Sequence, residues 1–227
     1  MTTAPTLLNA DGSTSMATMF LTSHHGFRRD IALFAIALGR PVEADRAHAL
    51  QDEWKKYCEK LHGHHMVEDQ NIFPGLRAQH ASLVAVIDQL GADHRRIDPL
   101  LAEGDRAFAE LPGSTRAAAA VVTQLSALLD RHLALEEEHI VPFLRDARQF
   151  PPPASDAEAQ LYAEGFAWSL HGIAPVVTGG IYALLPEILL AKLPAARAAF
   201  EARCERLWGA PAAGASLTSV PDWLVRT

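Results

Sequence analysis

The sequence predicts an all-α protein, an up-down-up-down four-helix bundle followed by an extra C-terminal helical cap. Three observations predict this fold class. Apolar residues recur at steps of three and four along four long segments, turn residues separate these segments, and no stretch of useful length alternates as a strand does. Four long amphipathic helices joined by short turns are typical of such a bundle.

The first two helices are bounded by residues that disfavour helix. An apolar stripe runs through residues 16–40, and Gly39 and Pro41 end that helix. The second helix is expected over about 43–76, with Pro74 beginning its unwinding.

The third and fourth helices flank a turn at residues 111–114. The third starts near Ala81, and Pro99 is expected to kink or shorten it. The fourth covers about 115–147 and completes the bundle.

Three consecutive prolines at 151–153 separate the bundle from a different kind of segment. Residues 165–186 contain no Asp, Glu, Lys or Arg, which raises the question of a membrane span. Pro175 and the glycine pair at 179–180 favour a buried, broken helical cap instead. A last helix is expected near 191–207. We therefore expect a flexible N-terminal tail (1–15), the metal-binding bundle (16–148), a helical extension packed on it (154–209) and a second tail (210–227).

Composition and charge narrow the function classes. The 227 residues are 49% hydrophobic and 21% charged, which excludes a wholly disordered chain. The net charge is −7 and no basic stripe is present, so nucleic-acid binding is not expected. Cys58 and Cys204 lie far apart, and the N-terminus lacks the basic and apolar regions of a secretory signal. We expect a cytoplasmic protein without a disulfide framework or a stable membrane span.

Histidine is unusually frequent, with 11 residues against 9 Phe, and some of the histidines belong to an internal repeat. His64 and Glu68 on the second helix, like His132 and Glu136 on the fourth, begin the pattern His-x-x-x-Glu-acid-x-x-Ile-x-Pro-x-Leu-Arg, and the two copies are 68 residues apart. Residues i and i+4 lie on one helix face, so the His and Glu side chains of each pair can reach the same point in the bundle.

The first and third helices each add a histidine to the same level of the bundle. His24 and His94 fall within the apolar stripes of their helices. Carboxylates are rarely buried unless they are paired or bind a metal, so a metal centre is favoured over hydrogen-bonded core histidines. Imidazole and carboxylate suit iron, zinc or manganese, and six ligands are too many for one tetrahedral zinc. Two ions bridged by the two glutamates fit the pattern better.

This arrangement resembles the bacterial hemerythrin HHE cation-binding domain. The segments that carry the resemblance are His24-x-x-x-Arg28-Arg29-Asp30, His64-His65-x-x-Glu68-Asp69, Asp93-His94-Arg95-Arg96-Ile97 and His132-Leu133-x-x-Glu136-Glu137. The resemblance covers about residues 16–148 and implies a non-haem di-iron centre in a four-helix bundle. The ligands it implies are His24, His64, Glu68, His94, His132 and Glu136. The extension resembles that of actinobacterial hemerythrin-like proteins.

One position departs from the oxygen-carrying members of that family. They use a fifth histidine one turn before the third-helix histidine, where this chain has Leu90. Tyr57 could occupy the metal coordination position that this fifth histidine would fill, although core packing is the simpler role for Tyr57. His65 is a candidate for a position around the ligands or at the rim of the site, and His171 could reach the site from the cap or serve only in packing. His25 is expected at the surface.

The function expected from these residues is that of a di-iron protein that reacts with dioxygen, peroxide or nitric oxide. A redox activity is favoured, either peroxide disproportionation or an oxygen-dependent oxidation, because open metal positions favour reactivity. Whether the protein is an enzyme stays open. One alternative is an oxygen or nitric oxide sensor or scavenger without turnover, and another is a structural cation-binding protein. The expected partners are small molecules, and no oligomeric state is predicted.

Overall fold

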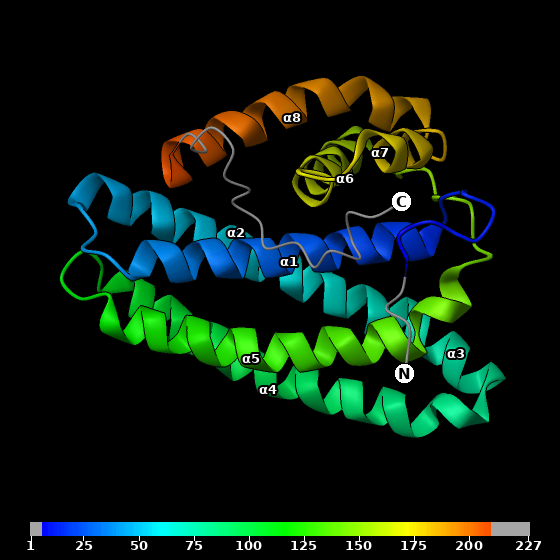
Figure 1. The fold of residues 1–227 in the computed structure, drawn as a ribbon, viewed down its shortest axis with the longest axis horizontal. Coiled ribbons are helices and arrows are strands. Elements are labelled where there is room, and N and C mark those ends of the chain that lie inside the picture. The colour runs from blue at the N-terminus through cyan, green and yellow to red at the C-terminus, as the bar shows by residue number, and fades with distance from the viewer. Residues whose placement is uncertain (1–5, 210–227) are drawn as a thin grey trace. The chain divides into compact units, whose positions relative to one another are not determined.

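The computed structural model describes residues 6–209, and they form helices and turns without a strand (Figure 1). The predicted all-α bundle with additional C-terminal helices is confirmed. The bundle helices are α1 (Met16–Leu38), α2 (Ala44–Val67), α4 (Val84–Ala109) and α5 (Arg116–His139). The extension contains α6 (Asp156–Ser169), α7 (Pro175–Tyr182) and α8 (Glu187–Trp208). None of the helices in this described range is long and apolar enough to cross a membrane. The tail expected at 210–227 lies outside the described residues.

Within the described range, the chain divides into two compact units. We call residues 30–139 the core unit, and residues 6–29 together with 140–209 the terminal unit. The boundary falls inside α1, so the first part of this helix belongs to the terminal unit and its last part to the core unit.

An aromatic cluster fixes one end of the core unit. The Trp54 ring of α2 stacks on the Phe108 ring of α4, with centroids 4.5 Å apart and planes 13° apart. Phe34 of α1 meets both rings edge-on, at 5.6 and 5.4 Å. Gly104 makes room for the indole, because a Cβ there would lie 2.1 Å from Trp54. This close packing holds three helices of the unit in a defined register.

The second helix differs from its expected form. α2 ends at Val67 and is followed by a π-helical turn, η1 (Glu68–Ile72), and then by α3 (Phe73–Gln79). Pro74 therefore does not unwind the helix. It lies in the first turn of α3, where its missing N–H leaves no helical hydrogen bond unmade. A short 3-10 turn, η2 (Ala81–Leu83), leads into α4.

The third and fourth helices also differ from their expected lengths. α4 passes through Pro99 and continues to Ala109, so this proline does not shorten the helix. The fourth helix stops earlier than expected, at His139, and a 3-10 turn, η3 (Val141–Leu144), follows it. Pro142 occupies the first turn of η3, as Pro74 does in α3. Both copies of the repeat leave regular α-helix near their glutamate, the first at Glu68 and the second after His139.

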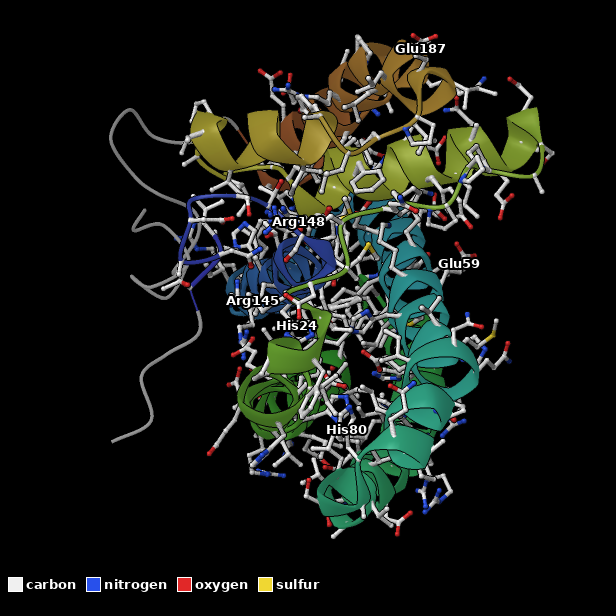
Figure 2. The ribbon with its side chains drawn as sticks, turned by 90° about the vertical axis from the view of Figure 1, so that its right-hand side faces the viewer. His24, Glu59, His80, Arg145, Arg148 and Glu187 are labelled. Atoms are coloured by element: carbon white, nitrogen blue, oxygen red, sulfur yellow. The ribbon has the colours of Figure 1, made fainter. Side chains whose placement is uncertain are left out.

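The extension packs on the first part of α1 within the terminal unit. α6 and α8 lie along each other (Figure 1), and Glu187 opens α8 with an exposed side chain (Figure 2). The Trp168 ring of α6 meets Phe27 of α1 edge-on at 4.9 Å. It also covers Gly26, where a Cβ would lie 2.6 Å from the indole. A side chain larger than hydrogen at Gly26 would therefore force the two helices apart.

Two polar residues of α1 also anchor the extension. Arg29 donates to the backbone oxygens of Trp168 (2.8 Å) and His171 (3.3 Å), at the C-terminal end of α6 where carbonyls lack helical partners. His25 Nε2 donates to the His171 oxygen over 3.0 Å. The expectation that His25 lies at the surface is wrong, since the ring is buried beside this turn.

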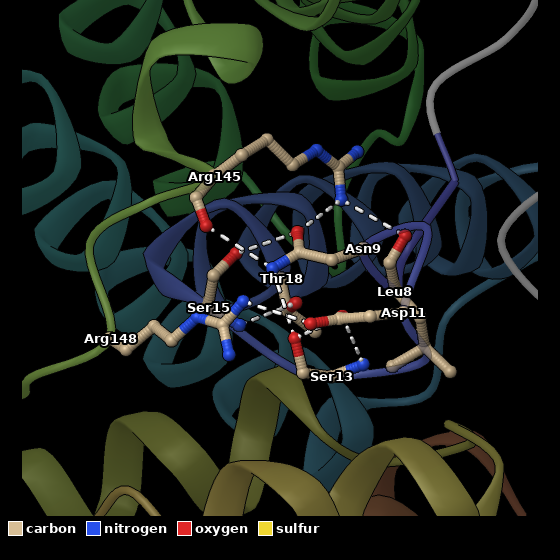
Figure 3. Close-up of polar contacts among 8 residues, drawn as sticks. All are labelled: Leu8, Asn9, Asp11, Ser13, Ser15, Thr18, Arg145 and Arg148. Atoms are coloured by element: carbon tan, nitrogen blue, oxygen red, sulfur yellow. Dashed lines mark hydrogen bonds and ion pairs between the residues drawn. The ribbon is translucent and has the colours of Figure 1, made fainter.

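The segment before α1 was expected to be a flexible tail, but its described part makes specific contacts (Figure 3). Leu7 is buried. Asn9 Nδ2 donates to the backbone oxygen of Arg145 (3.2 Å), whose guanidinium in turn donates to backbone oxygens of the segment. Asp11 pairs with Arg148 over 3.1 Å. These contacts span more than a hundred residues, which is why local composition did not reveal them.

Candidate metal centre

The core unit buries a set of histidines and glutamates at one level. They come from the end of α2, the start of η1, the middle of α4 and the second half of α5. Glu68, His132 and Glu136 are 0% exposed. His65 and His94 are buried as well, and His64 is half-buried. Such a concentration of ionisable groups in a helical core needs an explanation beyond packing.

One set of four side chains converges on a single point. His65, Glu68, His94 and His132 each offer one ligand atom, and these atoms all lie within 4.8 Å of one another. We call this set the three-histidine group. The His65 and His94 rings stack with centroids 4.0 Å apart, and the His132 ring lies edge-on to both, at 5.3 and 4.9 Å.

A second set shares a carboxylate with the first. His64, Glu68 and Glu136 offer ligand atoms that also lie within 4.8 Å of one another, and we call them the two-carboxylate group. Glu68 Oε1 lies 2.8 Å from His64 Nε2, and Glu68 Oε2 lies 3.3 Å from His94 Nε2. Glu136 Oε1 lies 3.3 Å from His132 Nε2. Each carboxylate thus faces residues of both groups, as a bridging ligand would.

Several buried nitrogen and oxygen atoms of these side chains lack hydrogen-bond partners among the described residues, and they are of the kinds that bind cations. Both oxygens of Glu68, both ring nitrogens of His132, and Nε2 of His65 and His94 are buried without a hydrogen bond of proper geometry among the described residues. Buried polar atoms are almost always bonded, and an unsatisfied one costs about 1–3 kcal/mol. Imidazole nitrogens and carboxylate oxygens are ligands of iron, zinc and manganese, so a cation would satisfy these atoms.

The pKa of His65 suits ligation, whereas that of His94 is set by neighbouring carboxylates. Burial, and then the neighbouring imidazoles, lower the pKa of His65, so its ring is neutral as a ligand must be. Burial also lowers the pKa of His94, but the Glu68 and Asp69 carboxylates beside the ring outweigh this effect, and the net shift is upward. Asp69 Oδ2 lies 3.0 Å from His94 Nδ1. A proton held on Nδ1 by this contact leaves Nε2 available to face Glu68.

Tyr57, which was considered as a ligand in place of the missing fifth histidine, lies in the aromatic cluster. Its ring is buried and stacks against Trp54, with centroids 5.8 Å apart and planes 20° apart. Burial, and then the charge of Asp30, raise the pKa of the Tyr57 phenol well above its usual value. A phenol that keeps its proton is a poor metal ligand compared with a phenolate.

Two further candidates belong to the terminal unit. His24 lies on α1 (Figure 2), fully buried, with its ring 4.6 Å from that of Phe20. The His171 ring packs edge-on to Phe200 of α8 at 5.2 Å, and its backbone oxygen accepts from His25 and Arg29. The packing role that the sequence offered for His171 is therefore the one its ring contacts support.

The residue that sequence reasoning missed is Asp69. From the sequence it had no expected role beyond the family motif, yet its carboxylate lies 3.0 Å from the imidazole Nδ1 of His94. A signal was present, because an acidic residue follows the glutamate in both copies of the repeat. His65 was expected either around the ligands or at the rim of the site, whereas it lies inside the three-histidine group.

Fold and site together define a class of protein, a helical bundle that encloses a histidine and carboxylate cation site. The model of the hemerythrin HHE cation binding domain matches residues 15–144 of the chain. The chain therefore belongs to the hemerythrin HHE cation-binding family, whose domain binds metal cations, usually iron. No curated protein and no solved structure matches the chain. The matched region ends before α6, so the extension lies outside it.

Proposed function

We propose that the protein holds two iron ions bridged by Glu68 and Glu136 and uses them to react with dioxygen, peroxide or nitric oxide. The observation that carries this proposal is Glu68. Its two buried oxygens face imidazoles of two different groups, His64 on one side and His94 on the other. A site built for one ion would not need a carboxylate directed at two centres.

The proposed ligands follow the two groups. His94 and His132 hold one ion, and His64 and His24 hold the other. His24 is included because it lies in the family-matched region, at the position that the resemblance gives to the first-helix ligand, and because its imidazole is fully buried on α1.

The chain's own residues shape what such a site can do. When bound, a pair of iron ions supplies the electron transfer that dioxygen, peroxide or nitric oxide require. Glu68 and Glu136 offset the positive charge inside the core, and Asp69 orients the His94 imidazole. Leu90 and Ile97 are fully buried on the same face of α4 as His94, and they exclude water from that side. We favour redox turnover, either peroxide disproportionation to water and dioxygen or an oxygen-dependent oxidation.

Metal analysis of the purified protein tests the centre. We expect about two iron ions per chain in the wild type and almost none in Glu68→Ala, which removes a bridge shared by both ions. Glu59→Ala is the matched control, because Glu59 lies on α2 with an exposed side chain directed away from the helices (Figure 2). About one zinc ion per chain, unchanged in Glu68→Ala, would contradict the di-iron proposal and support a structural cation site.

Reactivity of the loaded protein tests the chemistry. We expect the optical spectrum of the reduced protein to change on mixing with dioxygen, and added peroxide to be consumed over many turnovers. Reversible spectral changes without turnover would support a sensor or scavenger instead. A protein that holds two irons and reacts with none of the three molecules would refute the proposed function.

A further inference from the structure

We propose that His65 is a fifth imidazole ligand, bound to the ion of the three-histidine group, so that the two irons have unequal ligand sets. This inference rests on the proposed function. It assigns to α2 the imidazole that oxygen-carrying relatives place on the third helix, where this chain has Leu90.

The position of Glu68 relative to the two histidines supports the assignment. His64 and His65 precede Glu68 by four and three residues, and both spacings place side chains on neighbouring parts of one helix face. Glu68 therefore lies between them, one turn further on. Consecutive residues point about 100° apart around a helix, so the two imidazoles diverge. Their ring centroids are 6.0 Å apart, and each ring belongs to a different ligand group.

A π-helical turn begins at Glu68, three residues after His65. The backbone N–H of Glu68 bonds to the carbonyl oxygens of both His64 and His65, at the point where α2 gives way to η1. π-helical turns are uncommon and occur frequently at functional sites. The last turn of α2 thus joins all three side chains to one locally altered piece of backbone.

The burial of His65 also needs a cation to explain it. The side chain is only 4% exposed, and its Nε2 is buried without a hydrogen-bond partner in the described part of the chain. An ordinary core histidine would bond that nitrogen to a backbone or side-chain group. Here a His65 ring nitrogen lies within 4.8 Å of ligand atoms of His94, His132 and Glu68, which are themselves candidate ligands.

The repeat shows that the fifth imidazole serves only one of the two ions. The residue after His132 in the second copy is Leu133, which is fully buried. The ion of the three-histidine group would then have three imidazoles, and the ion held by His64 fewer. We infer that an incoming small molecule binds the ion on the His64 side, where fewer positions are filled.

Mössbauer spectroscopy of the iron-57 protein can test this inequality directly. The wild type should show two distinct quadrupole doublets of equal area, one for each ion. In His65→Leu we expect one doublet to shift or disappear while the other is retained, and iron content to fall from about two to as little as one per chain. His62→Leu is the matched control, because His62 is exposed on the same helix, and it should match the wild type.

A second variant separates ligation from packing. His65→Gly should lose the same doublet, and added imidazole should restore it by entering the space of the deleted ring. A purely structural histidine would not be rescued in this way. Should both variants fail to fold, as judged by their helical circular dichroism, the wild-type spectrum still decides, because two identical doublets would refute the inference.

The outcomes also distinguish this inference from the function on which it rests. A wild-type protein without iron refutes both. If the wild type holds two irons and the Mössbauer spectrum of His65→Leu equals that of the wild type, only the role of His65 is refuted.

Discussion

Leu90 is fully buried on α4, one turn before His94, so a histidine in its place would point toward the same ion. Because His65 already supplies the third imidazole to that ion, we expect Leu90→His to gain no ligand bond. The new ring would instead leave a polar group buried without a partner, at a cost of about 1–3 kcal/mol in the free energy of unfolding. Denaturant unfolding measures this cost.

The double variant Leu90→His/His65→Leu tests whether an imidazole on α4 can replace the one on α2. Moving the imidazole from α2 to α4 should restore the doublet that His65→Leu loses. If Leu90→His alone keeps full stability and changes the iron spectrum, the position at Leu90 is open and His65 does not fill it.

Tyr57 gives a second prediction at the scale of single residues. Its ring packs against Trp54, and burial raises the pKa of its phenol, so both features favour packing over iron binding. Tyr57→Phe should therefore leave the visible spectrum and the iron content unchanged. Loss of a charge-transfer band in this variant would instead make Tyr57 a ligand.

At the scale of elements, the sequence predicted what depends on local periodicity. The four-residue spacing of His64 and Glu68 placed both side chains on one face, and the structure brings their atoms within 2.8 Å. The π-helical turn was not predictable, because it depends on the i→i+5 hydrogen bonds that the backbone adopts around Glu68 and not on residue type. The contacts of Arg29 with the end of α6 join distant segments, and no local pattern encodes them.

The packing of α6 on α1 depends on a glycine. Gly-to-Ala in a helix interior normally stabilises by up to about 1 kcal/mol. At Gly26 the added Cβ would lie 2.6 Å from the Trp168 indole, so we expect Gly26→Ala to destabilise the protein by about 1–3 kcal/mol. Gly165→Ala on α6 is the control, because a Cβ there meets nothing within 4 Å and should stabilise slightly. Denaturant midpoints compare the two, and equal midpoints would mean that the indole moves aside at little cost.

At the scale of the whole molecule, α1 links the two compact units. Its first part, which carries His24, belongs to the terminal unit together with the extension, whereas its last part belongs to the core unit. The side chains around Trp168 thus hold the same stretch of helix that carries one proposed ligand. Stability of the extension and retention of iron should therefore be coupled, although the other proposed ligands all lie in the core unit.

Trp168→Ala tests this coupling in the full chain. Removal of a buried indole typically costs about 3–5 kcal/mol, and here it would loosen α6 from residues 26–29 of α1. We expect the variant to bind iron but to release it to a chelator several-fold faster than the wild type, because opening of the first part of α1 withdraws His24 from its ion. Leu161→Ala is the control on the same helix, since Leu161 is 65% exposed and its loss should not change the release rate. If Trp168→Ala is clearly less stable but releases iron at the wild-type rate, the extension stabilises the fold without affecting the metal centre, and the assignment of His24 as a ligand loses its support.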